Sequence, residues 1–300
     1  MKHVLSVLFC FICLEGFSQN YFEVVNVAYT TTPPNDFETS NAQTTVEEFA
    51  MEFNFPIVIN EKSVLLTGLF ANKTRVKLDA NMPKTDLNVL GLNLGFNKTF
   101  NDRWSATVMV FSKLATDKIE FSNDNLQIAL LSLFTNTKRD HLKWRYGLYA
   151  NTEQYGVMVV PILGLYYVSA NSKFEADLNL PILADINYQL GPKFWLGMGF
   201  DGLGTTYNLN EQSYSSNGAY AVKTSNELLG YLRFQLSKSL FLNTKVGYAI
   251  GRYYDVYDTN DKISFALTNI YFGDDRTRLN ERFNDGALFK VELLYRLYFE

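Results

Sequence analysis

Few residues of this chain could carry enzyme chemistry. Gly197, Gly199 and Gly202 have the G-x-G-x-x-G spacing of a dinucleotide-binding loop, but such a loop leads into a helix, and the stretch after Gly202 is typical of a strand. Beyond His3 the chain has one histidine, His141, in a charged stretch typical of a solvated turn. A membrane-embedded hydrolase would need a serine and an acid to converge on that base. We therefore expect no enzyme, with a hydrolase as the weaker alternative.

The chain also has few residues that could bind a metal or a cofactor. Cys10 and Cys13 lie in the N-terminal apolar stretch, so a chain cleaved after that stretch has no thiol for a metal or a disulfide. We expect no cofactor. The last long polar segment gathers carboxylates that could bind calcium, although their spacing is not that of an EF-hand and a solvated loop is the simpler interpretation. They belong to Asp255, Asp258, Asp261, Asp274 and Asp275, so calcium binding by residues 255–275 stays an open question.

Charged side chains recur on the polar side of alternating segments, where they would face the inside of a closed sheet. They could line a selective path for a small solute, as charged rings do in pores. They could instead pair with one another and close the interior. Both interpretations remain open. The candidate lumen charges are Lys143, Arg145, Glu175, Asp177, Asp185, Arg233, Lys245, Lys290, Glu292 and Arg296.

The N-terminus predicts export. Lys2 and His3 precede an apolar run from Val4 to Leu14, and residues 16–18, Gly-Phe-Ser, offer a small-x-small cleavage pattern. This order is that of a secretory signal peptide, and the run is too short to cross a bilayer as a helix. We expect residues 1–19 to be a signal peptide and residues 20–300 to form one β-barrel domain.

Apolar and polar residues alternate with a period of two along much of the chain, which is the pattern of strands with one apolar face. Phe174 to Gln189 is a clear run, and Ala287 to Phe299 repeats the pattern at the C-terminus. Pro161 and Pro181 lie within such runs and indicate a bulge or a strand end. The sequence predicts an all-β fold: a transmembrane antiparallel up-and-down β-barrel of about twelve strands, with fourteen as the alternative.

Short polar turns are expected at 60–62, 99–103, 191–193 and 237–239, and long polar loops at 30–43, 208–220 and 254–286. Short turns at one end and long loops at the other are typical of outer-membrane barrels. Residues 276–283 could form a helical turn within the last loop. Trp104, Trp144 and Trp195 each follow a predicted turn, as residues of an interfacial aromatic girdle do.

The chain resembles the uncharacterised outer-membrane β-barrel families of Gram-negative bacteria. The resemblance rests on three kinds of segment: the end of the predicted signal peptide, predicted hairpins and the predicted final strand. Their sequences are GFSQ, FNKTFNDRWSATVMV and INYQLGPKFWLGMGF, and ALFKVELLYRLYF. It implies the cell outer membrane as the location, outer-membrane lipid as the surroundings and the barrel-insertion machinery as a partner. That machinery recognises a terminal aromatic residue; here Phe299 is followed by Glu300, which departs from the pattern.

The sequence predicts the location of the protein more narrowly than its function. The net charge of −4 argues against a nucleic-acid partner. We expect a pore or transporter for small or amphipathic solutes. The sequence does not identify the solute. The alternative is a structural or surface-interaction barrel that acts through its long extracellular loops. The two interpretations cannot be separated by residue patterns, because both need the same closed sheet.

Overall fold

The computed structural model describes residues 21–211 and 214–298. The predicted signal peptide with its two cysteines, and the terminal aromatic Phe299, lie outside the described residues. The long strands are β1 (Tyr21–Thr31), β4 (Glu47–Asn60), β5 (Ser63–Lys77), β6 (Lys84–Asn101), β7 (Trp104–Thr116), β8 (Leu126–Arg139), β9 (Leu142–Glu153), β10 (Gly156–Val168), β11 (Phe174–Leu180), β12 (Leu183–Gly191), β13 (Phe194–Leu209), β14 (Ala219–Gln235), β15 (Leu240–Asp258) and β18 (Gly286–Tyr298). The connections hold β2 (Asn35–Asp36), β3 (Gln43–Thr44), β16 (Phe265–Leu267), β17 (Ile270–Phe272) and the 3-10 helix η1 (Asn123–Asn125).

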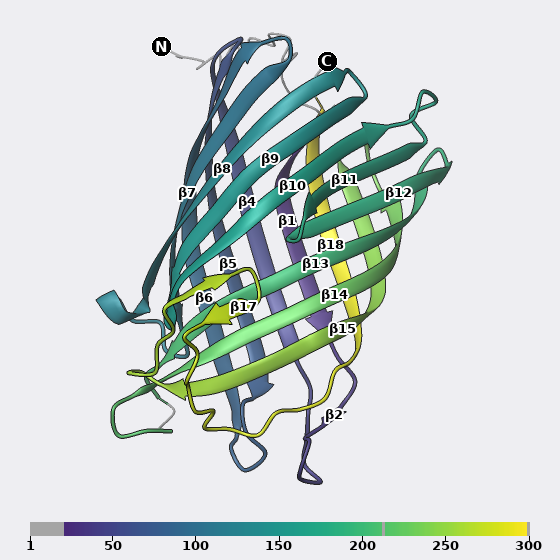
Figure 1. Ribbon diagram of the computed structural model, residues 1–300. Helices are drawn as coiled ribbons and strands as arrows, with labels where there is room; N and C mark the ends of the chain where they lie inside the picture. The colour runs from purple at the N-terminus through teal and green to yellow at the C-terminus, as the bar shows by residue number, and fades with distance from the viewer. Residues whose placement is uncertain (1–20, 212–213, 299–300) are drawn as a thin grey trace, which may run out of the picture.

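The fourteen long strands close into an antiparallel barrel (Figure 1). Each pairs with the next long strand along the chain, and β18 pairs with β1, with Val291 opposite Tyr29. This closure satisfies the backbone hydrogen bonds of the first and last strands, which would otherwise be open edges. The predicted all-β up-and-down barrel is confirmed. The strand number is that of the stated alternative, and the first expectation of twelve strands is wrong.

The undercount arises from two short strands. The alternating run from Phe174 to Gln189 is not one strand, because the chain reverses at Pro181 and Ile182 between β11 and β12. Alternation keeps its phase across this two-residue turn, so periodicity alone does not reveal the turn. The expectation that proline marks a strand end is confirmed at Pro181. It is wrong for Pro161, which lies inside β10 opposite Leu148.

Side chains alternate between an apolar outer face and a more polar inner face. On β13, Leu196 and Met198 are 49% and 71% exposed, whereas Gly197 between them is buried. On β18, exposed Val291 precedes buried Glu292. An apolar belt around the outside is what a barrel presents to lipid.

The two ends of the barrel differ. At the end where β1 begins and β18 ends, which we call the turn end, the connections are short, such as 61–62, 102–103 and 192–193. At the opposite end, the loop end, they include 32–46, 210–218 and 259–285. The predicted asymmetry is therefore present, with two exceptions at the loop end: residues 154–155 and 181–182 are tight turns. Among the described residues, no helix is long and apolar enough to cross a membrane.

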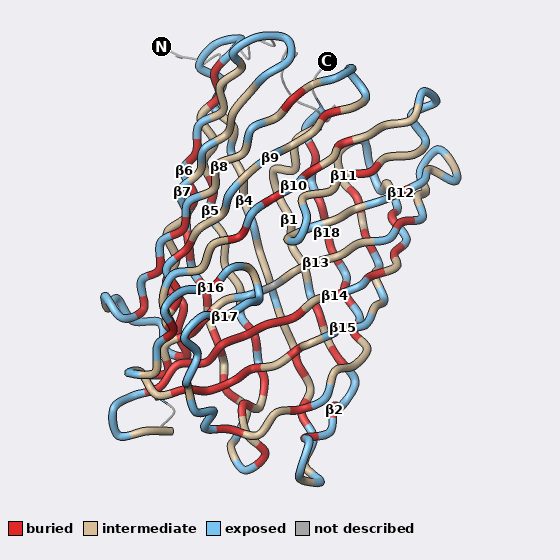
Figure 2. Tube along the Cα trace, viewed as in Figure 1, coloured by how far each residue is buried: buried red, intermediate tan, exposed pale blue. Residues whose placement is uncertain are grey.

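The loop end is closed by an apolar cluster that draws on opposite walls. Val76 of β5, Leu87 of β6 and Ala115 of β7 are fully buried in one cluster with Tyr207 of β13 and Val256 of β15. The barrel is therefore flattened there into two sheets that pack face to face, and buried residues gather at this end (Figure 2). Burial of apolar surface of this kind is the main stabilising contribution in a protein interior.

Candidate functional site in the barrel interior and wall

The candidate lumen charges lie on inner faces, and most of them contact an opposite charge. The pairs link strands that are neighbours or lie two or three places apart in the ring, and together they involve strands from β9 round to β1. Several partners were not among the predicted residues. The ion pairs are Arg145–Asp177 (2.5 Å), Arg233–Asp185 (3.3 Å), Lys245–Glu292 (2.8 Å), Arg296–Glu23 (2.6 Å), Lys290–Asp201 (2.9 Å) and Lys290–Glu227 (3.1 Å).

Two predicted charges stand apart from these pairs. Glu175 accepts a hydrogen bond from the Tyr166 hydroxyl at 3.0 Å and makes no ion pair within residues 21–211 and 214–298. Lys143 is 6% exposed and also lacks an ion pair within that part of the chain. The structure therefore brings eight of the ten predicted residues into ion pairs and leaves these two outside them.

A further ion pair reaches across four places of the ring. Lys223 of β14 contacts Glu48 of β4, and Glu48 also accepts a hydrogen bond from Asn72 at 2.7 Å. The inward direction of Glu48 could be read from its place on the polar face of an alternating run. Lys223 lies in a stretch without alternation, so residue patterning does not identify it.

The inner faces of β7, β8 and β10 carry apolar residues such as Phe111, Leu131 and Ile162, and two cavities lie beside them. One has a volume of about 350 Å³ and the other of about 510 Å³. Both fall in the range of small-molecule pockets, roughly 300–1,000 Å³. They adjoin at the centre of the barrel, because they share five lining residues. These are Phe111, Tyr149, Gly204, Thr205 and Lys223.

The larger cavity crosses the barrel wall. It is lined by Phe111 and Tyr149, which face inward, and also by Phe200 and Asn226. Phe200 is two residues from exposed Met198, and Asn226 is two residues from exposed Leu228, so both lie on the outer face of their strands, β13 and β14. A cavity lined by both faces of the wall passes from one side to the other.

The wall is open here because β11 and β12 are short. β11 pairs with β10 only over Leu163–Val168, and β12 pairs with β13 only as far as Asp201. Residues 156–162 of β10 and 202–207 of β13 therefore face each other without a barrel strand between them. We call this gap the side opening. It is bounded toward the turn end by the β11–β12 turn.

Proline and glycine account for the side opening. Val159 accepts a hydrogen bond from the Thr268 amide on the open edge of β10, at 2.8 Å. Two residues on, Pro161 faces the same edge and has no N–H to offer a further strand. On β13, a Cβ at Gly202 would lie 2.6 Å from the Pro181 carbonyl oxygen, so glycine allows the β11–β12 turn to approach closely.

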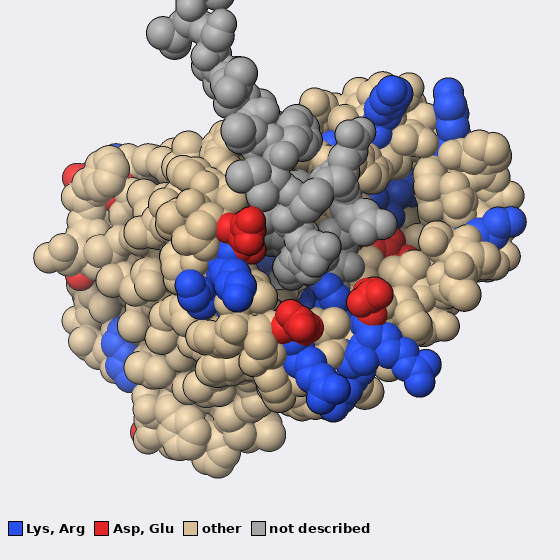
Figure 3. Space-filling model, turned by 90° about the horizontal axis from the view of Figure 1, so that it is seen from above, with Lys and Arg blue, Asp and Glu red and all other residues tan. Residues whose placement is uncertain are grey.

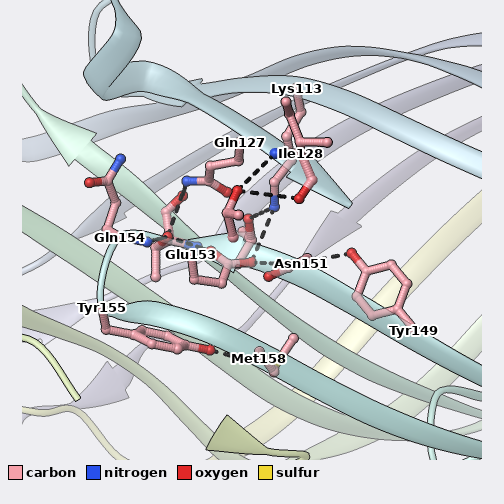
Figure 4. A network of polar contacts seen from close by, with 12 residues as sticks. Lys113, Gln127, Ile128, Tyr149, Asn151, Glu153, Gln154, Tyr155 and Met158 are labelled. Carbon is pink, nitrogen blue, oxygen red and sulfur yellow. Dashed lines mark hydrogen bonds and ion pairs between the residues drawn. The ribbon is translucent and has the colours of Figure 1, made fainter. Parts of the chain in front are cut away.

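A buried polar network closes the side opening toward the loop end (Figure 4). The Glu153 carboxylate on β9 accepts hydrogen bonds from the backbone amide of Thr206, at 2.7 Å, and from its hydroxyl. The side-chain amide of Gln127 donates to the Thr206 carbonyl at 2.9 Å, and the backbone amide of Gln154 donates to the Thr206 hydroxyl at 2.8 Å. Lys113 lies 3.5 Å from Glu153 and neutralises part of its charge. The end of β13 is thus fixed to β8 and β9 across the opening.

A hairpin from the last loop covers the side opening. β16 pairs in parallel with the open edge of β10, with Ala266 opposite Met158, and β17 folds back on β16 (Figure 1). The inner face of the hairpin packs against Tyr155 and Val222. Thr268 at its tip has a φ of 55°, which is unusual for a β-branched residue.

Arg276 anchors the base of this hairpin. Its guanidinium lies 4.3 Å from the ring centre of Tyr257 and 5.0 Å from that of Tyr271. It also forms a two-bond contact with Asp274, at 2.8 and 2.9 Å, and this hydrogen-bonded cation lowers the pKa of the Asp274 carboxyl. Residues 276–283 contain no helix, so the predicted helical turn there is wrong.

The basic side chains at the turn end do not line the two cavities. Lysine and arginine gather around the rim in the view down the barrel (Figure 3). They sit on or beside the short turns, and they include Lys62, Arg103, Arg139, Lys193 and Lys238. Two predicted girdle residues, Trp104 and Trp144, lie on outer faces near this end, whereas Trp195 faces inward and packs on Phe241, 5.9 Å between ring centres.

The other residues considered for chemistry have structural surroundings. Gly197 and its two partner glycines lie within one strand, and a Cβ at Gly197 would overlap the Tyr231 ring. His141 lies in the exposed β8–β9 turn. The five acidic residues between 255 and 275 do not converge: no group of three potential metal ligands occurs within the described residues. Asp255, for example, contacts Arg282.

Comparisons with solved structures find barrels of low sequence identity. An outer membrane channel from Pseudomonas putida F1 has 8% identity and a TM-score of 0.48, over 92% of this chain and 95% of that one. The NanC porin has 7% identity and a TM-score of 0.40, over 91% and 100%. The translocator domain of the autotransporter NalP from Neisseria meningitidis has 9% identity and a TM-score of 0.38, over 92% and 89%.

A comparison with curated proteins found no match. The family model described as Domain of unknown function (DUF6268) matches residues 14–291, which is most of the chain. This agrees with the expectation of an uncharacterised barrel family. The chain belongs to the DUF6268 family.

Proposed function

We propose that this protein is an outer-membrane channel that passes small amphipathic solutes through its interior. The observation that supports this most is the pair of adjoining cavities beside the apolar residues of β7, β8 and β10. In the larger one, Phe111, Leu131 and Ile162 supply apolar surface, and Asn179 and Thr205 supply hydrogen-bonding groups. An apolar lining with a few polar groups is characteristic of sites for small molecules.

The outer surface supports the proposed location. Exposed side chains such as Leu92 (52%), Leu163 (56%) and Val246 (55%) lie on different strands around the barrel. In water this much apolar surface would drive aggregation, whereas in a bilayer it is solvated by lipid. Outer-membrane lipid and the barrel-insertion machinery are therefore proposed as partners. No residue set points to a reaction, and the absence of enzyme activity stays a prediction.

The ion pairs support a path for amphipathic solutes rather than for ions. The fields of two paired charges largely cancel, so an ion that passes through the interior is attracted only weakly. Separating the paired charges is costly, because the interior has a lower dielectric constant than water. Lys223, the cation that lines both cavities, is in contact with Glu48. We propose that the ion pairs hold the strands together and that the apolar side chains of β7, β8 and β10 contact the solute.

The test is uptake of an uncharged naphthylamine dye, which fluoresces in apolar surroundings, by Gram-negative cells that produce the protein. Production of the wild-type chain should accelerate uptake. Gly204→Trp should remove the acceleration, because a Cβ at Gly204 meets only one atom, 4.0 Å away, and the ring would extend into both cavities. Gly230→Trp is the control, since Gly230 has similar space on the outer face of β14.

Equal uptake with and without the protein would contradict the proposal, as would full acceleration by the Gly204→Trp variant. Heat-modifiable migration on gels checks that each variant is folded. The alternative function, a structural or surface-interaction barrel, predicts no acceleration by any of the chains. No contact in the described loops favours that alternative.

A further inference from the structure

The outer face of the β16–β17 hairpin is apolar. Phe265 and Phe272 stack at 4.4 Å between ring centres and are 43% and 41% exposed, and Ile270 is 58% exposed. A loop that projects into water would place polar residues on such a face. This face instead continues the apolar outer surface of β10, with which the hairpin pairs. The hairpin therefore lies against the wall at the level of the lipid.

The interior cavities lead toward this hairpin. At the loop end, the face-to-face packing of β5–β7 on β13–β15 buries Tyr207 and Val256 completely. The larger cavity, in contrast, extends through the side opening, where Phe200 of its lining belongs to the outer face of β13. Its outer part is lined by Tyr271 of the hairpin.

We infer that solutes cross the wall sideways: the side opening connects the interior cavities with the surrounding lipid, and the β16–β17 hairpin is the movable cover of this route. The inference rests on the proposed function and adds the route and the class of solute. The solute is a small uncharged molecule with an apolar body and one hydrogen-bonding group, which reaches the opening from the lipid.

The chemistry of the opening selects this class. A charged solute would leave water for a lining whose cation, Lys223, is in contact with Glu48 and offers no free counter-charge. A solute with one hydrogen-bonding group can in addition use the polar groups of the lining, which a purely apolar solute cannot. Asn226 and Thr224 of β14 and Asn179 near the β11–β12 turn lie along the passage and can exchange hydrogen bonds with one polar group of the solute.

The hairpin is attached so that it can move without opening the barrel. β16 shares two residue pairs with β10, whereas β9 shares twelve with the same strand. Detachment of the hairpin leaves every pair of the fourteen-strand ring intact. Its base is held by Arg276, packed among tyrosine rings and bound to Asp274. Gly273, with a φ of 65°, lies between β17 and this anchor and supplies a pivot.

A reversible tether tests the inference. In a chain with Cys10→Ser and Cys13→Ser, the changes Val159→Cys and Leu267→Cys place two thiols on directly paired residues of β10 and β16. Paired strands bring Cα atoms within the roughly 4.4–6.8 Å that a disulfide needs. Loss of free-thiol labelling shows that the disulfide has formed. The control is Leu69→Cys with Leu92→Cys, a directly paired and exposed couple on β5 and β6.

Uptake of the naphthylamine dye should fall to the level of cells without the protein when the β10–β16 tether is oxidised, and a reductant should restore it. The β5–β6 tether should leave uptake unchanged. Arg276→Ala, which frees the base of the hairpin, should raise uptake above wild type, whereas Arg278→Ala, 3.8 Å from Asp255 at the surface, should not.

The outcomes separate this inference from the proposed function. Dye uptake by the wild-type protein that is unaffected by the oxidised β10–β16 tether would overturn the sideways route and leave the channel proposal standing. Absence of uptake by the wild-type protein would overturn both. Uptake that falls equally with the β10–β16 tether and with the β5–β6 tether would also contradict the inference, because the effect would not be specific to the hairpin.

Discussion

Thr206 of β13 is hydrogen-bonded to Glu153 of β9, although three strands separate β9 from β13 in the ring. The contact crosses the side opening at the loop end, from β13 to β9, and buries a carboxylate whose side chain is 1% exposed. The width of the opening is therefore set by one polar network together with the β11–β12 turn.

Thr206→Val removes the hydroxyl from this network while keeping the shape of the side chain. The buried carboxylate then lacks one hydrogen bond, and we expect a loss of about 1–3 kcal/mol in the free energy of unfolding. Urea titration of the protein folded in detergent measures this change. Thr244→Val, at an exposed position of β15, is the control and should be neutral. Equal stability of the two variants would show that the network does not hold the strands together.

The Glu48–Lys223 pair should behave as a coupled unit. Lys223→Met leaves Glu48 in the interior without its cation, and we expect a loss of about 3–5 kcal/mol in unfolding free energy. The double change Glu48→Met with Lys223→Met should recover most of that loss, because no unpaired charge remains. Four-variant urea titrations measure the coupling. Losses that simply add would mean that the two side chains do not depend on each other.

Val291 faces outward on β18 and is 47% exposed. Val291→Arg would place a charge in the lipid, which destabilises a barrel by about 2–4 kcal/mol near the bilayer midplane. Refolding into lipid vesicles measures the loss. Leu279→Arg provides the comparison, because Leu279 is 38% exposed but lies in the last loop. If both changes were equally tolerated, the apolar belt would not face lipid.

Much of the fold could be predicted from the sequence because alternation with a period of two reports directly on inner and outer faces. The run at Ala287–Phe299 is a strand as predicted, as far as its residues are described. Alternation does not report where a strand reverses, which is why β11 and β12 were predicted as one strand. Pro181 carried that signal, since a proline has no N–H for the next strand.

The candidate site was predictable only in part. Inner-face charges such as Arg145 and Asp177 follow from alternation, but their partners depend on which strands meet across the ring. The side opening depends on a mismatch of strand lengths between β10, β11, β12 and β13, and no local pattern encodes such a mismatch. Its one local sign was Pro161, a proline in the middle of an otherwise regular strand.

The central claim is that the interior cavities hold an apolar solute. A crystal structure of the protein grown with a brominated naphthalene locates that solute through the anomalous scattering of bromine. We predict a bromine site between Phe111, Tyr149 and Gly204, where the two cavities adjoin, and loss of that site in the Gly204→Trp variant. Bromine found only on the outer apolar surface, with the cavities free of it, would contradict the account.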